Sequence, residues 1–124
     1  MEIVTSEQTE TCVLQITLND TKRRNALGIE MFDAIDGALS LVDTQTRCVL
    51  LLGEGSVFCA GFDMKACASD IAILKTYILR LSALIRSLRR LPVPVVVAAH
   101  GAAIAGGCAL LTGCDFVVGS KESK

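Results

Sequence analysis

Tryptophan is absent from this sequence, histidine occurs once, and aromatic residues make up only 4% of the 124 residues. Proteins that bind single-stranded nucleic acid stack the bases on aromatic side chains, which are scarce here. Charge of one sign is also lacking, since 12 Lys and Arg stand against 13 Asp and Glu for a net charge of −1. Sequence-independent nucleic-acid binding needs a positive field. We therefore expect no nucleic-acid partner.

The sequence has no CxxC pair, and its single histidine leaves no zinc-finger spacing, so we predict no metal site. The first seven residues are polar and acidic, unlike a signal peptide. Hydrophobic residues make up 52% of the chain and supply a core without disulfides. We expect a cytoplasmic protein with reduced cysteines that act as small buried hydrophobes. These are Cys12, Cys48, Cys59, Cys67, Cys108 and Cys114.

Residues 91–114 contain no Asp, Glu, Lys or Arg, and two arginines precede them. One interpretation of such a stretch is a membrane span. Pro92 and Pro94 open it, however, and four glycines interrupt it. This punctuation favours a buried strand, a turn and a short buried helix, so we expect no membrane partner.

Hydrophobic periodicity predicts an α/β layered fold. Strands are expected at 2–5, 12–18, 47–52, 93–99 and 115–119. Helices are expected at 26–42, 70–90 and 106–112. Asn25 is the expected N-cap of the first helix. Residues 47–52 are apolar on both faces, as in a buried parallel strand. The buried stripe of the second helix is expected to comprise Ile71, Leu74, Ile78, Leu81, Ile85 and Leu88.

Two glycine-bearing loops, 58–65 and 100–109, each follow a predicted strand. Ligands bind at strand ends in α/β sheets, and small residues let a ligand approach the backbone. A helix that begins at Gly106-Gly107 would direct free N–H groups at a bound group, and two converging N–H groups form an oxyanion hole. Tight turns that merely permit close packing are the alternative, because neither loop is a full dinucleotide or Walker motif.

Ionisable candidates for catalysis are sparse. His100 has the features of a turn histidine with satisfied hydrogen bonds, and a role as catalytic base is the alternative. Cys59 and Cys108 are expected to be buried packing residues, although a helix N-terminus can lower the pKa of a thiol. Asp63 has two interpretations, as a base or as the cap of a following helix. Asp115 is expected to be structural. The basic loop 22–24 is either a solvated loop or a cationic site for a phosphate-bearing ligand.

Taken together, these segments resemble the crotonase family, also called the enoyl-CoA hydratase/isomerase family. Residues 22–27 (KRRNAL) resemble its K-x-N-A-L motif, and residues 57–65 (VFCAGFDMK) resemble its F-x-A-G-x-D-hydrophobic-K loop. Residues 91–108 resemble its P-V-P-x-I-A-A-x-x-G-x-A-x-G-G-G segment, and Cys114-Asp115 matches the C-D that opens the next strand. The motifs occur in the family's order along nearly the whole chain.

The resemblance implies a spiral of ββα units that binds acyl-CoA thioesters, with coenzyme A as part of the substrate and no separate cofactor. It implies an oxyanion hole formed by the backbone N–H groups of Phe62 and Gly106. Because the donor is a backbone group, Phe62 can replace the usual small residue, and its ring is expected to narrow or reshape the acyl pocket. The implied substrate- and CoA-binding residues are Arg24, Ala26, Leu27, Ala60, Gly61, Asp63 and Met64.

Two departures from the family pattern bear on the activity. Ala109 stands where hydratases carry their first catalytic Glu, and a methyl group cannot activate water. The second catalytic Glu and the C-terminal helical region of full members, which are about twice as long, would follow residue 124. Residues 1–124 thus resemble an N-terminal crotonase core, a partial domain that is apparently truncated before the C-terminal helical region.

These departures favour an isomerase-like reaction over hydration, in fatty-acyl or branched-chain acyl-CoA metabolism. A full-length form is expected to be a homotrimer or hexamer. The alternative is a catalytically inactive, truncated protein that binds acyl-CoA or a partner.

Overall fold

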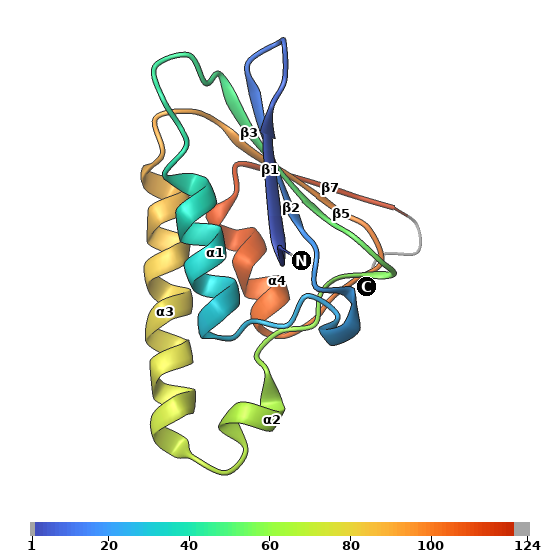
Figure 1. The fold of residues 1–124 in the computed structure, drawn as a ribbon, viewed down its shortest axis with the longest axis vertical. Coiled ribbons are helices and arrows are strands. Elements are labelled where there is room, and N and C mark those ends of the chain that lie inside the picture. Colours follow the sequence, from blue (N-terminus) through green and yellow to red (C-terminus); the bar gives the residue numbers. More distant parts are fainter. Residues whose placement is uncertain (1, 121–124) are drawn as a thin grey trace.

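The computed structural model describes residues 2–120 and has the α/β architecture expected from the sequence (Figure 1). Its strands are β1 (Val4–Gln8), β2 (Val13–Leu18), β3 (Cys48–Gly53), β4 (Val57–Cys59), β5 (Val95–Ala99), β6 (Ala102–Ala103) and β7 (Phe116–Gly119). Its α-helices are α1 (Ile29–Leu39), α2 (Met64–Cys67), α3 (Ile71–Arg90) and α4 (Gly106–Leu110). Two 3₁₀ turns, η1 (Thr21–Arg23) and η2 (Leu111–Gly113), complete the described elements.

Five strands form one sheet in the order β1-β2-β3-β5-β7. β1 and β2 form an antiparallel hairpin, whereas β2, β3, β5 and β7 are parallel. The remaining strands, β4 and β6, pair in parallel as a second sheet of two strands. Parallel neighbours need crossover connections, and α1, α3 and α4 lie within those connections. The prediction of helices between parallel strands is confirmed.

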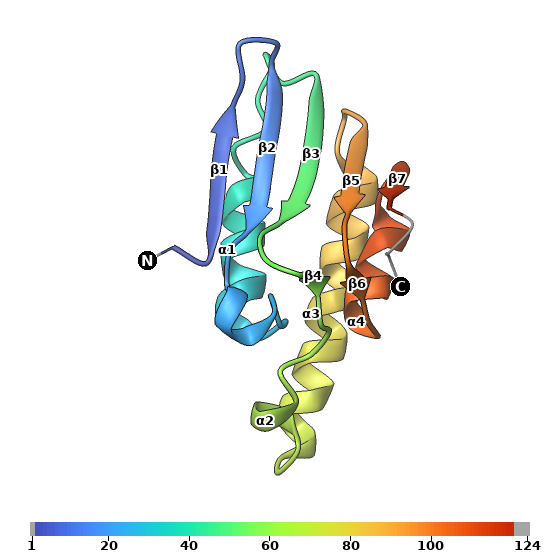
Figure 2. The same ribbon diagram turned by 90° about the vertical axis from the view of Figure 1, so that its right-hand side faces the viewer.

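Helices α1, α3 and α4 cover one face of the larger sheet, as the turned view in Figure 2 shows. The strand residues that point toward these helices are at most 2% exposed. They are Leu14, Ile16, Leu18, Val49, Leu51, Val95 and Val97. The period-2 pattern predicted for 12–18 is therefore confirmed from residue 14 onward, because Cys12 lies in the turn before β2.

No helix among residues 2–120 covers the other face of the sheet (Figure 2). The register places Leu50 of β3 beside Val96 of β5, and Val96 beside Phe116 of β7. Leu50 and Val96 are half-buried, and Phe116 is 64% exposed. The expectation that residues 47–52 form a strand buried on both faces is thus wrong. β7 lies at the sheet edge, and all four of its residues are exposed.

The first helix begins later than predicted. Helix α1 starts at Ile29 with Gly28 at its N-cap, so the assignment of Asn25 as the cap is wrong. Arg24 and Asn25 have left-handed backbones, with φ of 52° and 56°, and Leu27 pairs with the chain at Phe62. These conformations are incompatible with helical hydrogen bonding. The pattern is correct within the helix, where Met31, Ile35 and Leu39 are buried.

The buried face of α3 is also rotated relative to the prediction. Tyr77, Leu81, Leu84 and Leu88 are buried, whereas Ile71 and Ile78 are 83% and 50% exposed. The N-terminal end of α3 extends past the sheet, and the short helix α2 packs against α3 (Figure 2). Asp70 caps the helix, since its side chain accepts the Ala72 N–H at 2.9 Å. No helix among residues 2–120 is long and apolar enough to cross a membrane.

The asymmetry of the sheet predicts unequal costs for two adjacent truncations. Leu51→Ala removes a side chain that is 1% exposed and should lower the free energy of unfolding by about 3 kcal/mol. Leu50→Ala removes a half-buried side chain from the uncovered face and should cost about 1 kcal/mol. Urea denaturation followed by circular dichroism measures both. Equal costs would contradict the one-sided burial of β3.

Candidate functional site

The structure brings the two glycine-bearing loops together. β4 leads into the first loop and pairs in parallel with β6 of the second. Beyond this pairing, the N–H of Ile104 donates to the carbonyl of Cys59 at 3.0 Å. A methyl group on Gly61 would lie 2.8 Å from the carbonyl oxygen of Ile104, and Gly61 has a φ of 91°. Only glycine satisfies both constraints, which explains this residue in the first loop.

Phe62 and Gly106 are neighbours across the two loops. A methyl group on Gly106 would lie 3.5 Å from Cε1 of Phe62 and 3.6 Å from Cα of Gly61. Gly106 is the first residue of α4, where an N–H has no partner within the helix. Among residues 2–120, the structure records no acceptor for the backbone N–H of Phe62 or of Gly106. The site therefore holds two neighbouring backbone donors available to an acceptor.

The turn that precedes α4 is strained. Ala105 has a φ of 49° and a ψ of −114°, a conformation that residues with a side chain rarely adopt. Gly107 follows Gly106 closely packed on β4, because a methyl group there would overlap the carbonyl of Cys59. The close packing of α4 on β4 thus fixes the orientation of the Gly106 N–H. Gly107 thus allows α4 to pack closely on β4, and this packing fixes the position of the N–H of Gly106.

Asn25 holds the first loop in place. Its side chain is fully buried, and its amide nitrogen donates to the carbonyls of Glu54, Val57 and Phe58 at 3.0 to 3.2 Å. Its side-chain oxygen accepts the N–H of Asp20 at 2.8 Å. One side chain thus joins the chain after β2 to the chain before and within β4. The sequence signal for this role is an asparagine between a polar loop and an apolar run, and that signal also fits an N-cap.

Next to Asn25, residues 24–27 pair with residues 60–63. The N–H of Leu27 donates to the carbonyl of Gly61 at 2.7 Å, and the N–H of Asp63 donates to the carbonyl of Leu27 at 2.8 Å. The N–H of Ala60 donates to Arg24 at 3.0 Å. The bonds to Leu27 use the carbonyl of Gly61 and the N–H of Asp63, and the N–H of Phe62 between them takes no part in the pairing. The basic loop and the first glycine loop therefore form one unit.

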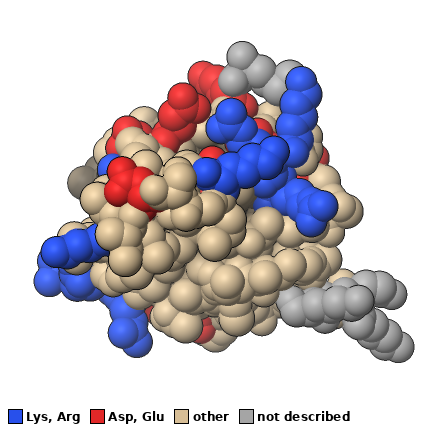
Figure 3. All heavy atoms as spheres, turned by 90° about the horizontal axis from the view of Figure 1, so that it is seen from below, with Lys and Arg blue, Asp and Glu red and all other residues tan. Residues whose placement is uncertain are grey.

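A cleft of about 700 Å³ lies over this unit. Its lining residues are Lys22, Arg23, Arg24, Ala26, Ala60, Phe62, Asp63, Met64, Lys65 and Ala66. The view from below shows Lys and Arg side chains gathered on that face (Figure 3). Four basic side chains and one carboxylate line the cleft, so it suits an anionic ligand.

The lining includes most of the residues predicted to bind substrate. Arg24, Ala26, Ala60, Asp63 and Met64 all border the cleft. Leu27 and Gly61 do not, because both are buried beneath it and contribute backbone pairing instead. These placements leave the predicted binding roles as predictions.

Tyr77 is a site residue that sequence reasoning missed. It is 4% exposed on α3, and its ring lies 5.7 Å from the ring of Phe62, centroid to centroid. Burial raises the pKa of its phenol, and the negative charges of Asp63 and Cys67 raise it further. Tyr77 also borders a smaller cavity of about 210 Å³, together with Gly28 and Asp63. The sequence prediction assigned Ile78 to the buried face of this helix. A buried face shifted by one residue would have included Tyr77 instead.

The six cysteines differ in how far they are buried. All six are free thiols, as predicted. Cys59 is fully buried, and burial raises its pKa to about 11 although the N–H of Gly61 partly offsets this effect. Cys108 is exposed, so its assignment as a buried packing residue is wrong. The short helix α4 turns this residue outward, whereas its neighbour Gly107 faces β4.

Two of the remaining ionisable candidates, His100 and Asp115, have structural contacts. His100 Nε2 is hydrogen-bonded to the carbonyl of Gly55, as expected of a turn histidine. The carboxylate of Asp115 accepts the N–H of Val95 at 2.7 Å, which confirms its structural role. Asp63 occupies the N-cap position of α2 without a capping side-chain bond. Ala109 is half-buried on α4 and offers no acid or base.

A family model described as enoyl-CoA hydratase/isomerase matches residues 8–124 of the chain. The enoyl-CoA hydratase EchA19 of Mycobacterium tuberculosis is 38% identical over an alignment of length 118 that covers 90% of this chain and 44% of that protein. The human mitochondrial Delta(3,5)-Delta(2,4)-dienoyl-CoA isomerase is 34% identical over an alignment of length 132 that covers 91% of this chain and 38% of that protein.

A crystal structure of an enoyl-CoA hydratase from Mycobacterium smegmatis matches the fold with a TM-score of 0.93 at 30% identity. The match covers 99% of this chain and 49% of that structure. The chain therefore has the crotonase fold over its described length and spans about half the length of the proteins it matches.

The hydrogen bonds of Asn25 predict a large effect on stability. Asn25→Ala removes a fully buried amide together with its bonds to three carbonyls, of which the bond to Phe58 is buried, and should lower the free energy of unfolding by about 3 kcal/mol. The matched control is Asn19→Ala, which removes one exposed bond of 3.3 Å and should cost at most about 0.5 kcal/mol. Urea denaturation of both variants is the measurement, and similar costs would contradict the role assigned to Asn25.

The burial of the thiols predicts their reactivity. In native protein at pH 8, Cys108 should give the fastest reaction with a thiol reagent, and Cys59 should not react. Because the pKa of Cys59 is raised to about 11, its thiol stays protonated until the pH approaches that value. Cys108→Ser should remove the fast phase and Cys59→Ser should retain it. A fast phase that survives Cys108→Ser would contradict this assignment.

Proposed function

The chain belongs to the enoyl-CoA hydratase/isomerase family, and from that premise we propose that it binds acyl-CoA thioesters with the carbonyl between the N–H groups of Phe62 and Gly106. The observation that carries the proposal is the pair of neighbouring backbone donors without acceptors among residues 2–120. Each donor is fixed by the packing around it, one by residues 24–27 and the other by β4. Fixed donors stabilise an enolate because they point to where its negative charge develops.

The basic cleft supports the proposal for the other end of the substrate. Coenzyme A carries phosphates, and Lys22, Arg23, Arg24 and Lys65 line the cleft beside Phe62. Cationic side chains bind phosphate through charge-assisted hydrogen bonds. Ala26 and Ala60 have small side chains at the same cleft and leave room for the ligand against the backbone. Arg24, Ala26, Leu27, Ala60, Gly61, Asp63 and Met64 are proposed as the substrate- and CoA-binding residues.

For the reaction, we propose isomerase-type chemistry rather than hydration. Hydration of an enoyl thioester needs a group that activates water, and Ala109 has none at the position that the family motif assigns to the first acid. An isomerisation needs only one group that moves a proton between two carbons. Two curated relatives are named as isomerases: the human dienoyl-CoA isomerase, and the 1,2-epoxyphenylacetyl-CoA isomerase of Escherichia coli, which is 33% identical. Asp63 is the carboxylate among the residues that line the cleft.

A second candidate function is acyl-CoA binding without turnover. Ala109 favours it, because the donors that hold a thioester are retained while the hydratase acid is replaced. The two functions share a binding site and differ in turnover. Incubation with an enoyl-CoA and analysis of the products by chromatography separates them.

The proposed donors predict different effects for two substitutions at Gly106. Gly106→Ala keeps the N–H, and its methyl group fits because the nearest atoms lie at 3.5 Å. Gly106→Pro removes the N–H at the first position of a helix, where the φ of proline is acceptable. We expect the proline variant to lose at least about tenfold in affinity for acetoacetyl-CoA and the alanine variant to bind like wild type. Calorimetric titration measures the affinities.

Cys108→Ala is a control on the same helix and should leave the affinity unchanged, since this side chain is exposed. Circular dichroism melts establish that each variant is folded. Equal affinity of folded Gly106→Pro and Gly106→Ala would contradict the assignment of Gly106 as a donor.

A further inference from the structure

Phe62 places an aromatic ring directly beside the two donors. Its N–H is one proposed donor, and its ring reaches the other, since Cε1 would lie 3.5 Å from a methyl group on Gly106. The same side chain lines the 700 Å³ cleft and is half-buried. Any group bound between the two N–H groups is therefore in reach of the ring.

We infer that the ring of Phe62 is a fixed wall of the acyl site that restricts it to short acyl groups, an inference that rests on the function proposed above. The ring, and not the backbone of Phe62, then decides which thioesters the site accepts.

Contacts behind the ring hold it in place. Tyr77 lies 5.7 Å from Phe62 and 6.2 Å from Phe32, with tilted ring planes in both pairs. The guanidinium of Arg80 lies 5.4 Å from the Phe32 ring and forms salt bridges with Asp33 at 2.7 Å and with Asp36. Aromatic and cation–π contacts of this kind stabilise a single arrangement. The Phe62 ring thus rests on a packed layer of aromatic side chains between α1 and α3.

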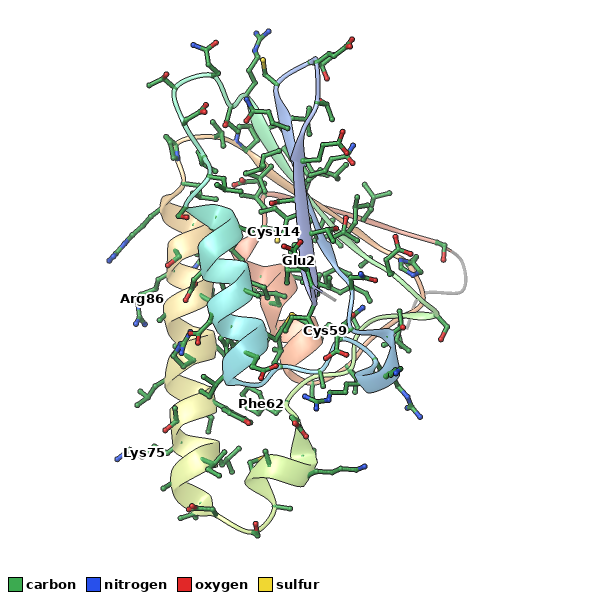
Figure 4. The ribbon with its side chains drawn as sticks, viewed as in Figure 1. Glu2, Cys59, Phe62, Lys75, Arg86 and Cys114 are labelled. Atoms are coloured by element: carbon green, nitrogen blue, oxygen red, sulfur yellow. The ribbon has the colours of Figure 1, made fainter. Side chains whose placement is uncertain are left out.

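The direction of the ring places it on the acyl side of the thioester. A thioester carbonyl carries two substituents, the sulfur that leads to coenzyme A and the first carbon of the acyl group. The basic residues Lys22 and Arg23 lie on η1, whereas the Phe62 side chain points toward α3 on the other side of the loop (Figure 4). With the phosphates at the basic end, the acyl carbon leaves the carbonyl toward the ring.

A binding series tests this inference. The ligands are coenzyme A, acetoacetyl-CoA and 3-oxodecanoyl-CoA. All three contain the coenzyme A moiety, and they carry no acyl group, a short acyl group and a long acyl group, respectively. Wild type should bind acetoacetyl-CoA at least about tenfold more tightly than the long-chain ligand, because a rigid apolar wall excludes added methylenes. Phe62→Ala keeps both N–H donors and should raise the affinity for 3-oxodecanoyl-CoA by at least about tenfold.

Two controls accompany the series. Coenzyme A itself, which has no acyl group, is titrated into wild type and Phe62→Ala as the reference, and the affinity of each protein for the two acyl ligands is expressed relative to it. Phe116→Ala removes an aromatic ring of the same size from β7, which is far along the chain and does not line the cleft, and should leave the chain-length preference of wild type unchanged. Phe62→Leu provides a smaller apolar side chain if the alanine variant is unstable, and it should give an intermediate preference.

The outcomes distinguish this inference from the function on which it rests. If neither wild type nor Phe62→Ala binds any of the three ligands, the proposed function fails and the inference fails with it. If both proteins bind acetoacetyl-CoA but show the same preference between the two acyl groups, the proposed function stands and the wall is refuted. A preference that shifts toward the long chain only in the Phe62 variants supports the wall.

Discussion

Three backbone carbonyls, one from the loop before β4 and two from β4 itself, converge on the single buried amide of Asn25, and the geometry of the site depends on this contact. The amide fixes the chain between β3 and β4 against the chain that follows β2. With these segments joined, residues 24–27 can pair with residues 60–63, and that pairing leaves the N–H of Phe62 without an acceptor among the described residues. A buried polar network of this kind is stable only when each member is satisfied. Asn25 thus links the stability of the fold to the presentation of a donor.

The sequence predicted the regular elements better than the site. Apolar alternation of period 2 identified β2, and continuous apolar runs identified β3 and β5. The two-stranded sheet of β4 and β6 was not predicted, because strands of three and two residues are too short to show a periodic pattern. The start of α1 was missed because long-range bonds of Asn25 and Leu27 override a local capping preference. Such bonds join residues more than thirty positions apart.

The two proposed donors were predicted from family motifs, and the structure places Phe62 and Gly106 on neighbouring loops. Glycine spacing alone allowed tight turns with no role in binding. The close approach of Gly106 to Gly61 and Phe62 adds that the two loops lie side by side. The helical period alone could not decide between Tyr77 and Ile78, because residues 77, 81, 84 and 88 also have helical spacing and an aromatic residue with a hydroxyl is the less apolar choice. The chain spans about half of its relatives, and both proposed donors lie within that half.

The central claim is that two backbone N–H groups, from Phe62 and Gly106, hold one thioester oxygen. Its most direct test is a titration of ¹⁵N-labelled protein with acetoacetyl-CoA, followed through the amide resonances of these two residues. A hydrogen bond to a developing oxyanion moves an amide proton downfield. We predict that both resonances move downfield together and saturate at the same ligand concentration, while the amide of Leu50 on the far face of the sheet stays in place. Saturable shifts elsewhere with both donor resonances unmoved would contradict the claim.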